Sequence, residues 1–128
     1  MNDVKKIGVR HIGFTGRGEP FLHPDILFFV RTVKQSKIQC SVLSNGTLIS
    51  ENILSTLASY RLDFLVLSLW DCDEERYEEL RPGHRDDFRR IKAVLDFCRK
   101  NKKGSPPLRL TFLFNNRNYN RADEMLRF

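Results

Sequence analysis

The chain has 128 residues, 30% of them charged and 41% hydrophobic, a balance typical of a folded globular protein and not of a disordered or collagen-like chain. This length suits one domain or part of one and excludes two. No apolar run approaches the roughly 18 residues that a membrane span requires, and residues 1–6 lack the apolar stretch of a secretion signal. We therefore expect a cytoplasmic protein with no membrane partner.

The charge balance is basic. Lys and Arg number 22 against 16 Asp and Glu, and the net charge of +6 attracts phosphates, nucleic acids and acidic partners in general. The densest basic run, residues 99–103, falls where a helix is predicted to end, so complementarity with the helix dipole explains it better than nucleic-acid binding does. The three cysteines, Cys40, Cys72 and Cys98, fit neither a disulfide framework nor a paired-cysteine zinc site, which indicates a reducing compartment.

Strands and helices are predicted to alternate along the chain. Apolar alternation and short apolar runs predict four strands, at residues 9–14, 39–44, 63–69 and 108–114. Helical spacing of apolar residues predicts helices after each of the first three strands, beginning at Pro24, at Ser50 and, after the third, at residues 73 and 86. Gly104 is predicted to end the helix over residues 86–102 in a left-handed conformation, and Asn120 to cap a last helix. Cys98 lies on the apolar stripe of the longer helix and is predicted to be in the core.

This alternation implies parallel strands joined by right-handed crossovers, an α/β fold with one parallel sheet. Four such units can form a curved open sheet but not a closed eight-stranded barrel, which needs ~250 residues. The first and last strands of an open sheet present edges that need cover. We therefore expect residues 1–128 to form a single domain that is incomplete.

Ligand sites in parallel α/β folds form beyond the carboxyl ends of the strands. Polar or glycine-rich segments follow all four predicted strands, at residues 15–20, 44–47, 68–71 and 115–116. Backbone beside glycines can approach an anion closely, and Glu19 can accept hydrogen bonds from an ammonium group, so together they suit a zwitterion. The Asn45-Gly46 pair suits a tight turn, and the Ser68 hydroxyl suits a sugar hydroxyl. Taken alone, each signal is more typical of a turn or a local cap.

Three of these segments resemble motifs of the radical S-adenosylmethionine (SAM) enzymes, in the same order along the chain. Residues 15–25, Thr-Gly-Arg-Gly-Glu-Pro-Phe-Leu-His-Pro-Asp, are similar to the family's Gly-Gly-Glu-Pro segment. Residues 44–48 are similar to its Thr-Asn-Gly segment, and residues 67–83 to its fourth-strand segment. The resemblance spans residues 7–115 and implies a radical SAM core domain made of four consecutive βα units, the second to the fifth, of a partial (βα)6 TIM-like barrel.

The resemblance also implies where SAM binds. The implied cofactor-binding residues are Gly16, Gly18, Glu19, Pro20, Asn45, Ser68 and Asn115. Gly18 and Glu19 with the adjoining backbone would hold the methionine amino group, and Ser68 would lie near the ribose. Arg17 replaces the first glycine of the motif, so either the backbone there suits a residue for which positive φ is costly or the guanidinium pairs with a carboxylate. Trp70 and Asp71 are candidates to face a substrate, with packing and entry into the next helix as the structural alternatives.

The family's chemistry depends on a [4Fe-4S] cluster held by three thiolates of a Cys-x3-Cys-x2-Cys loop, and this chain contains no such loop. The resemblance implies that a complete protein cleaves SAM reductively to a 5′-deoxyadenosyl radical, acting on an unknown substrate. The isolated chain, with no metal ligands of its own, would be inactive.

Three interpretations remain open at this point. The leading one is a part of a radical SAM enzyme that lacks the cluster-bearing first unit and the C-terminal part, with that remainder of the barrel as its partner. The second is a naturally clusterless domain with a binding or scaffold role. The third and least favoured is a basic α/β module that binds nucleotides or RNA, which the net charge of +6 supports but which no stacking-aromatic motif on the strands supports.

Overall fold

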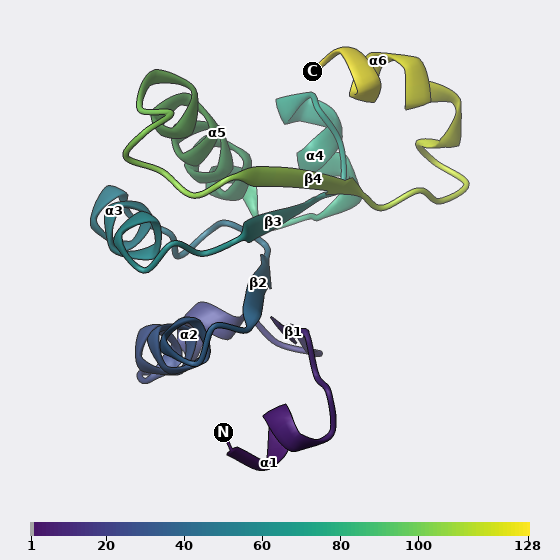
Figure 1. Cartoon of the computed structure of the whole chain (residues 1–128). Helices are drawn as coiled ribbons and strands as arrows, with labels where there is room; N and C mark the ends of the chain where they lie inside the picture. The colour runs from purple at the N-terminus through teal and green to yellow at the C-terminus, as the bar shows by residue number, and fades with distance from the viewer. Residues whose placement is uncertain (1) are drawn as a thin grey trace.

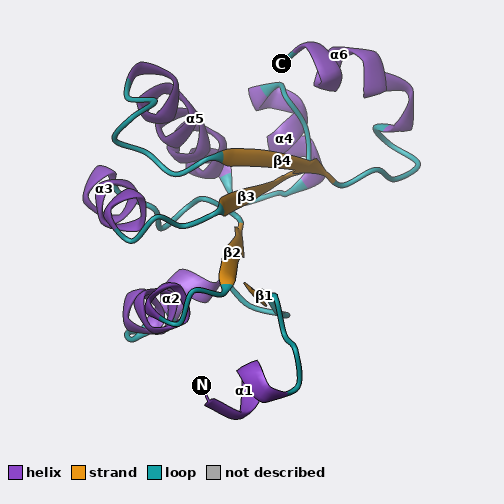
Figure 2. Cartoon of the chain, viewed as in Figure 1, coloured by secondary structure: helices purple, strands orange, loops and turns teal. Residues whose placement is uncertain are grey.

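The computed structural model describes residues 2–128, and its centre is a four-stranded parallel sheet in the order β1-β2-β3-β4 (Figure 1). The strands are β1 (His11–Phe14), β2 (Gln39–Ser44), β3 (Phe64–Leu69) and β4 (Leu108–Phe112). The helices that connect them are α2 (Ile26–Gln35), α3 (Glu51–Ser59), α4 (Glu74–Leu80) and α5 (Arg85–Lys100). Strands adjacent in the chain are adjacent in the sheet, so the predicted α/β fold with parallel strands is confirmed (Figure 2).

Local side-chain chemistry explains where two of the helices begin. The Ser50 hydroxyl accepts the backbone N–H of Ile53 at 3.3 Å and caps α3. The Asp73 carboxylate accepts the backbone N–H of Arg76 at 3.1 Å and caps α4. Gly83 ends the turn between α4 and α5 at a φ of +85°, as the Arg-Pro-Gly sequence predicts.

The strand register divides the sheet into two faces. Phe14, Val42, Leu65 and Leu108 are paired across the four strands and so share one face, which α2, α3 and α5 cover (Figure 1). The residues on the opposite face are half-buried or exposed in every strand. These are His11, Gly13, Gln39, Ser41, Leu43, Phe64, Val66, Ser68, Arg109 and Thr111.

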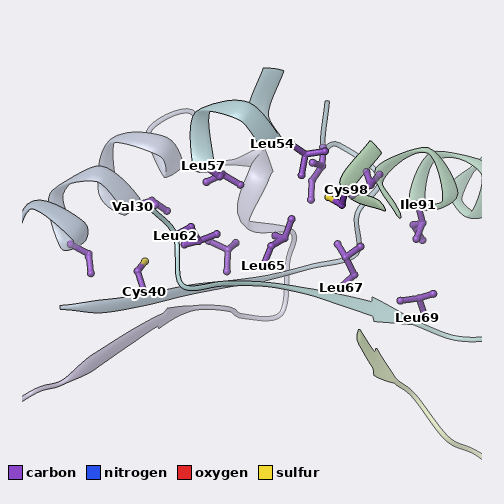
Figure 3. Packing of buried hydrophobic residues seen from close by; sticks show 14 of the residues in the cluster. Val30, Cys40, Leu54, Leu57, Leu62, Leu65, Leu67, Leu69, Ile91 and Cys98 are labelled. Atoms are coloured by element: carbon purple, nitrogen blue, oxygen red, sulfur yellow. The ribbon is translucent and has the colours of Figure 1, made fainter. Parts of the chain in front are cut away.

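The hydrophobic core fills the space between the covered face and the helices (Figure 3). Leu65, Leu67 and Leu69 of β3 are fully buried, as their nearly continuous apolar run predicts for a parallel strand inside the sheet. Cys98 of α5 is 7% exposed, so the prediction that it lies in the core is confirmed. No helix among the described residues is long and apolar enough to cross a membrane. The expectation about a secretion signal concerns residues 1–6, of which Met1 lies outside the described residues.

Several predicted boundaries are wrong. The fourth strand ends at Phe112 and not at residue 114, and Phe114 is 53% exposed beyond it. Gly104 does not have a positive φ, because α5 already ends at Lys100 and Asn101 caps it. A further helix, α1 (Asn2–Lys6), precedes the first strand, which begins at residue 11 and not at residue 9.

The end of the chain also differs from the prediction. Two short helices form there, η2 (Tyr119–Arg121) and α6 (Ala122–Arg127). Asn120 therefore lies inside η2 and does not cap a helix, and neither helix has a side-chain cap. The buried amide of this segment belongs instead to Asn118.

Candidate functional site

The candidate site lies at the edge of the sheet where all four strands end. Parallel order brings the segments that follow β1, β2, β3 and β4 to this one edge, as predicted. A cavity of about 350 Å³ opens there beside the loop that follows β1. Its lining is Phe14, Thr15, Gly16, Gly18, Glu19, Pro20, His23, Ile26 and Phe29. Four of the predicted cofactor-binding residues, those of the Gly-Arg-Gly-Glu-Pro segment, therefore line one cavity.

The Glu19 carboxylate joins the loops that follow β1 and β2. Its Oε1 accepts the Ser44 hydroxyl at 2.7 Å, and its Oε2 accepts the backbone N–H of Asn45 at 2.8 Å. Oε1 also accepts the backbone N–H of Phe21 at 3.2 Å, which caps the short helix η1 (Pro20–Leu22). A carboxylate has about four acceptor positions, so one position on Oε2 remains for a further donor.

Gly16 and Gly18 leave open space where a side chain would stand. A Cβ at either glycine would have no atom within 4 Å from any residue beyond its two chain neighbours, and neither glycine has a positive φ. The packing of the described chain therefore does not require these glycines, whereas close approach of a ligand to the backbone would. Arg17 between them has no positive φ either, so the backbone there suits a residue for which positive φ is costly, as one of the two expectations had it. The alternative, an ion pair of the Arg17 guanidinium, is not found with any described residue.

The Asn45-Gly46 turn is shaped by its own hydrogen bonds. The Asn45 Oδ1 accepts the backbone N–H of Thr47 at 2.9 Å and its hydroxyl at 2.7 Å. Gly46 has a φ of +80°, and a Cβ there would lie 3.1 Å from a side-chain carbon of Ile91. The predicted positive-φ turn is confirmed, and the side-chain oxygen of Asn45 is engaged within it.

Ser68 lies on the uncovered face of the sheet, half-buried, in the last layer before the edge. Its register partner is Thr111 of β4, so two hydroxyl-bearing side chains stand next to each other on that face. No hydrogen bond joins the Ser68 hydroxyl to another described residue, which leaves the group available to a polar ligand.

Asn115 and Asn118 form a turn after β4. The sequence pointed to Asn115 but not to Asn118. The Asn115 side chain accepts the backbone N–H of Arg117 at 2.8 Å, so it shapes its own turn. Asn118, 1% exposed, donates from its amide to the carbonyls of Trp70 at 2.7 Å and Leu113 at 2.9 Å. Its Oδ1 accepts the backbone N–H of Asn115 at 2.7 Å. One buried amide thus holds the ends of β3 and β4 together.

Asp71 is buried and does not face open space. Its Oδ1 accepts the backbone N–H groups of Cys72 at 2.8 Å and Asp73 at 3.1 Å, and it pairs with Arg121 at 3.1 Å. The side chain is 1% exposed, so of the two possibilities weighed for it the structure favours entry into the next helix over contact with a substrate. Sequence reasoning missed Arg121 and Asn118 because each acts on a segment about fifty residues away, and no local pattern marks such a contact.

The cysteines do not form a metal site. Burial raises the pKa of Cys40 to about 11, and burial followed by the neighbouring Asp71 carboxylate raises the pKa of Cys72 above its usual value. Burial raises the pKa of Cys98 as well. A cluster needs thiolates, and within residues 2–128 no three His, Cys, Asp or Glu side chains gather around one point. The described residues therefore do not fit an iron–sulfur cluster.

Parallel βα units with a Gly-Glu-Pro loop and an Asn-Gly turn at one edge define a class of protein, and comparison with known families agrees. The model of the radical SAM superfamily matches residues 1–128, and the chain belongs to that superfamily. The resemblance found in the motifs is thereby confirmed.

Individual relatives cover the whole chain at low identity. The PqqA peptide cyclase of Granulibacter bethesdensis is 24% identical over 126 residues, 98% of this chain and 32% of that protein. The tungsten-containing aldehyde ferredoxin oxidoreductase cofactor-modifying protein of Pyrococcus furiosus is 25% identical over 132 residues, 100% of this chain and 37% of that protein. The chain thus spans about a third of the length of these relatives.

Solved structures show the same core. SuiB of Streptococcus suis bound to the precursor peptide SuiA has a TM-score of 0.77 and 27% identity, over 98% of this chain and 27% of that chain. SuiB bound to S-adenosylmethionine is similar with a TM-score of 0.59 at 21% identity, over 98% of this chain and 36% of that chain, a likeness of fold alone. The prediction of consecutive βα units from a TIM-barrel-like radical SAM core is confirmed.

Proposed function

We propose that this chain is part of a radical SAM enzyme core and that it supplies the protein side of a SAM-binding site at the carboxyl ends of β1, β2 and β3. The observation that carries the proposal is the cavity beside the Gly-Arg-Gly-Glu-Pro loop, with two glycines whose side-chain positions are empty. SAM has an ammonium and a carboxylate on its methionine part and hydroxyls on its ribose. Those are the groups that the residues at this edge are equipped to bind.

Each residue has a distinct part in this proposal. The unused acceptor position on Glu19 Oε2 takes a hydrogen bond from the methionine ammonium, while its other bonds hold the carboxylate in place. Gly16 and Gly18 let the backbone approach the cofactor without a side chain between them. The Ser68 hydroxyl binds a ribose hydroxyl. Asn45, Asn115 and Pro20 shape the loops that carry these groups.

The radical chemistry belongs to the complete enzyme. In the complete enzyme a [4Fe-4S] cluster would supply the electron for the reductive cleavage of SAM. Because the described residues do not fit such a cluster, its ligands have to come from outside them. The test is to read the DNA upstream of the Met1 codon, in the same frame, for a strand followed by Cys-x3-Cys-x2-Cys. An in-frame stop codon directly upstream would favour a clusterless binding domain instead.

SAM binding by this chain is tested by nuclear magnetic resonance. A titration of ¹⁵N-labelled chain with SAM is expected to shift the amide signals of Gly16, Gly18, Glu19 and Ser68 together. The amides of the last turn of α5, which lies at the opposite edge of the sheet where the strands begin, serve as the internal reference and are expected to stay unchanged. No shift at the site up to millimolar SAM, or shifts confined to other residues, would contradict the proposal.

A peptide is the substrate class that the relatives support for the complete enzyme. One relative is named a PqqA peptide cyclase, and SuiB has been solved with a precursor peptide bound. The test is mass spectrometry of short peptides encoded beside the gene, after incubation with cluster-containing enzyme, reductant and SAM. Peptide masses that stay unchanged while SAM is cleaved would contradict a peptide substrate from that neighbourhood.

A further inference from the structure

A basic groove lies along the edge of the sheet opposite the SAM site. Three cavities of about 670, 450 and 480 Å³ open where the strands begin and the helices end. The first two share Arg61 in their linings, and the second and third share the segment 105–107, so the three form one continuous surface. Gln39, Phe64 and Leu108, which begin β2, β3 and β4, line the second and third cavities and fix the position of this surface.

The charge of the groove is almost entirely positive. Its lining carries six cations, which are Arg31, Lys34, Arg61, Arg99, Lys102 and Lys103. It carries one carboxylate, that of Asp63, which is already paired with Lys34. None of the other five cations forms an ion pair with an acidic side chain anywhere in residues 2–128. The groove therefore carries five cations that no ion pair within residues 2–128 neutralises.

Helix dipoles account for only part of this charge. Lys34 lies in the last turn of α2, and Arg99 in the last turn of α5, where a cation complements the helix end. Arg31, Arg61, Lys102 and Lys103 lie outside those last turns, so the dipole explanation does not cover them.

The backbone at Arg61 is a second, independent observation. Arg61 has a φ of +57°, and Lys37 after α2 has a φ of +58°; they are the only described residues other than glycine in this conformation. A left-handed residue after a helix is usually glycine or asparagine, and another residue there costs about 1 kcal/mol. At Arg61 the costly residue is an arginine at the junction of two cavities. Lys37 has the same backbone conformation but lines none of the three cavities, so the feature that distinguishes Arg61 is its position at their junction.

We propose that this groove binds the phosphate backbone of RNA. Unpaired cations repeated across three adjoining cavities match a polymer that carries one negative charge on each nucleotide. The arginine guanidinium can also donate two parallel hydrogen bonds to the oxygens of one phosphate. Arg31 lies over the Tyr60 ring, 6.0 Å from its centroid, in the first cavity, and an arginine–aromatic pair is a platform on which a base stacks. The groove lies on the opposite edge from the SAM site, so this binding is independent of the function proposed above.

The test measures fluorescence anisotropy of a labelled oligouridylate of about 20 nucleotides with the whole chain, at several salt concentrations. We expect micromolar binding at low salt that weakens steeply as salt rises. The triple variant Arg31→Gln, Lys102→Gln, Lys103→Gln removes one cation from each cavity and is expected to lower the slope of log K against log salt by about 2. The matched control Arg90→Gln, Arg117→Gln, Arg127→Gln removes three exposed cations elsewhere and is expected to keep most of the slope.

Arg61→Gly separates binding from folding. It relieves the left-handed backbone, so we expect no loss of thermal stability together with weaker RNA binding. Equal loss of binding in the groove and control variants would mean that net charge alone is responsible, and absence of binding at low salt would refute the proposal outright. Polyglutamate serves as a competitor of the labelled oligonucleotide. If it competes as well as unlabelled RNA of equal charge, the partner of the groove is an acidic polypeptide and not RNA.

Discussion

Removal of the buried Asn118 amide is expected to destabilise the chain well beyond the usual effect of a loop substitution. Asn118→Ala deletes two donors and one acceptor and leaves the carbonyls of Trp70 and Leu113 and the N–H of Asn115 without these partners. An unsatisfied buried polar group costs about 1–3 kcal/mol, but Leu113 is exposed and Asn115 half-buried, so water recovers part of the loss. We expect a decrease of about 2–4 kcal/mol in the free energy of unfolding.

The matched control is Asn116→Ala. Asn116 is the same residue type in the same loop, is exposed, and makes no side-chain hydrogen bond to a described residue. Its substitution is expected to change the free energy of unfolding by less than about 0.5 kcal/mol. Both variants are compared by urea denaturation, followed by circular dichroism and by the fluorescence of Trp70, the single tryptophan of the chain. Equal unfolding free energies for the two variants would refute the conclusion that the Asn118 amide joins β3 to β4.

Three further predictions concern the turn, the ion pair and the thiols. Gly46→Ala is expected to lower the free energy of unfolding by about 1–3 kcal/mol in urea denaturation, because alanine disfavours its φ of +80° and the new Cβ would lie 3.1 Å from Ile91. Burial alone would raise the pKa of Asp63. The hydrogen bonds that its carboxylate accepts, first of all from Lys34 of α2, outweigh burial and lower the pKa below 3.8. Because the pKa of Asp63 is lower in the folded than in the unfolded chain, its contribution to stability is complete above about pH 4 and is lost as pH falls further. Asp63→Asn is therefore expected to make the urea midpoint fall less steeply in acid than it does for the parent. Cys72 is expected to react with an aromatic disulfide reagent before the two buried thiols, and Cys72→Ser to remove the fast phase.

The sequence predicts the elements of this fold well because local patterns determine them. The apolar side chains of β3 have to be buried on the face of the sheet against which α3 and α5 pack. The observed register of β3 with β2 and β4 is the one that buries them. The turn at Gly46 follows from the two residues alone. Boundaries are less predictable: α5 ends at Lys100, although helical spacing continues past it, because Asn101 caps the helix before Gly104 is reached.

The site is less predictable because its geometry depends on contacts between distant segments. The motif containing Glu19 is visible in the sequence, but its bonds to Ser44 and Asn45 are not. The ion pair of Asp71 with Arg121 spans fifty positions in the chain and leaves no periodic signal. Polar residues that join loops have the same composition as residues that only cap turns, so only the folded structure separates the two roles.

The double engagement of Glu19 determines which substitution can test SAM binding. Glu19→Gln disturbs three hydrogen bonds within the protein, so it is expected to lower stability and SAM affinity together, and a loss of affinity alone would not demonstrate contact. Gly16→Ala adds a methyl group that meets no atom within 4 Å beyond its two chain neighbours, so it is expected to leave the free energy of unfolding within about 0.5 kcal/mol of the parent. If SAM approaches this backbone, the same methyl group displaces it, and the titration should show affinity weakened by about tenfold, or about 1.4 kcal/mol. Unchanged stability with unchanged affinity for Gly16→Ala would remove Gly16 from the site, because nothing in the protein could then mask the contact.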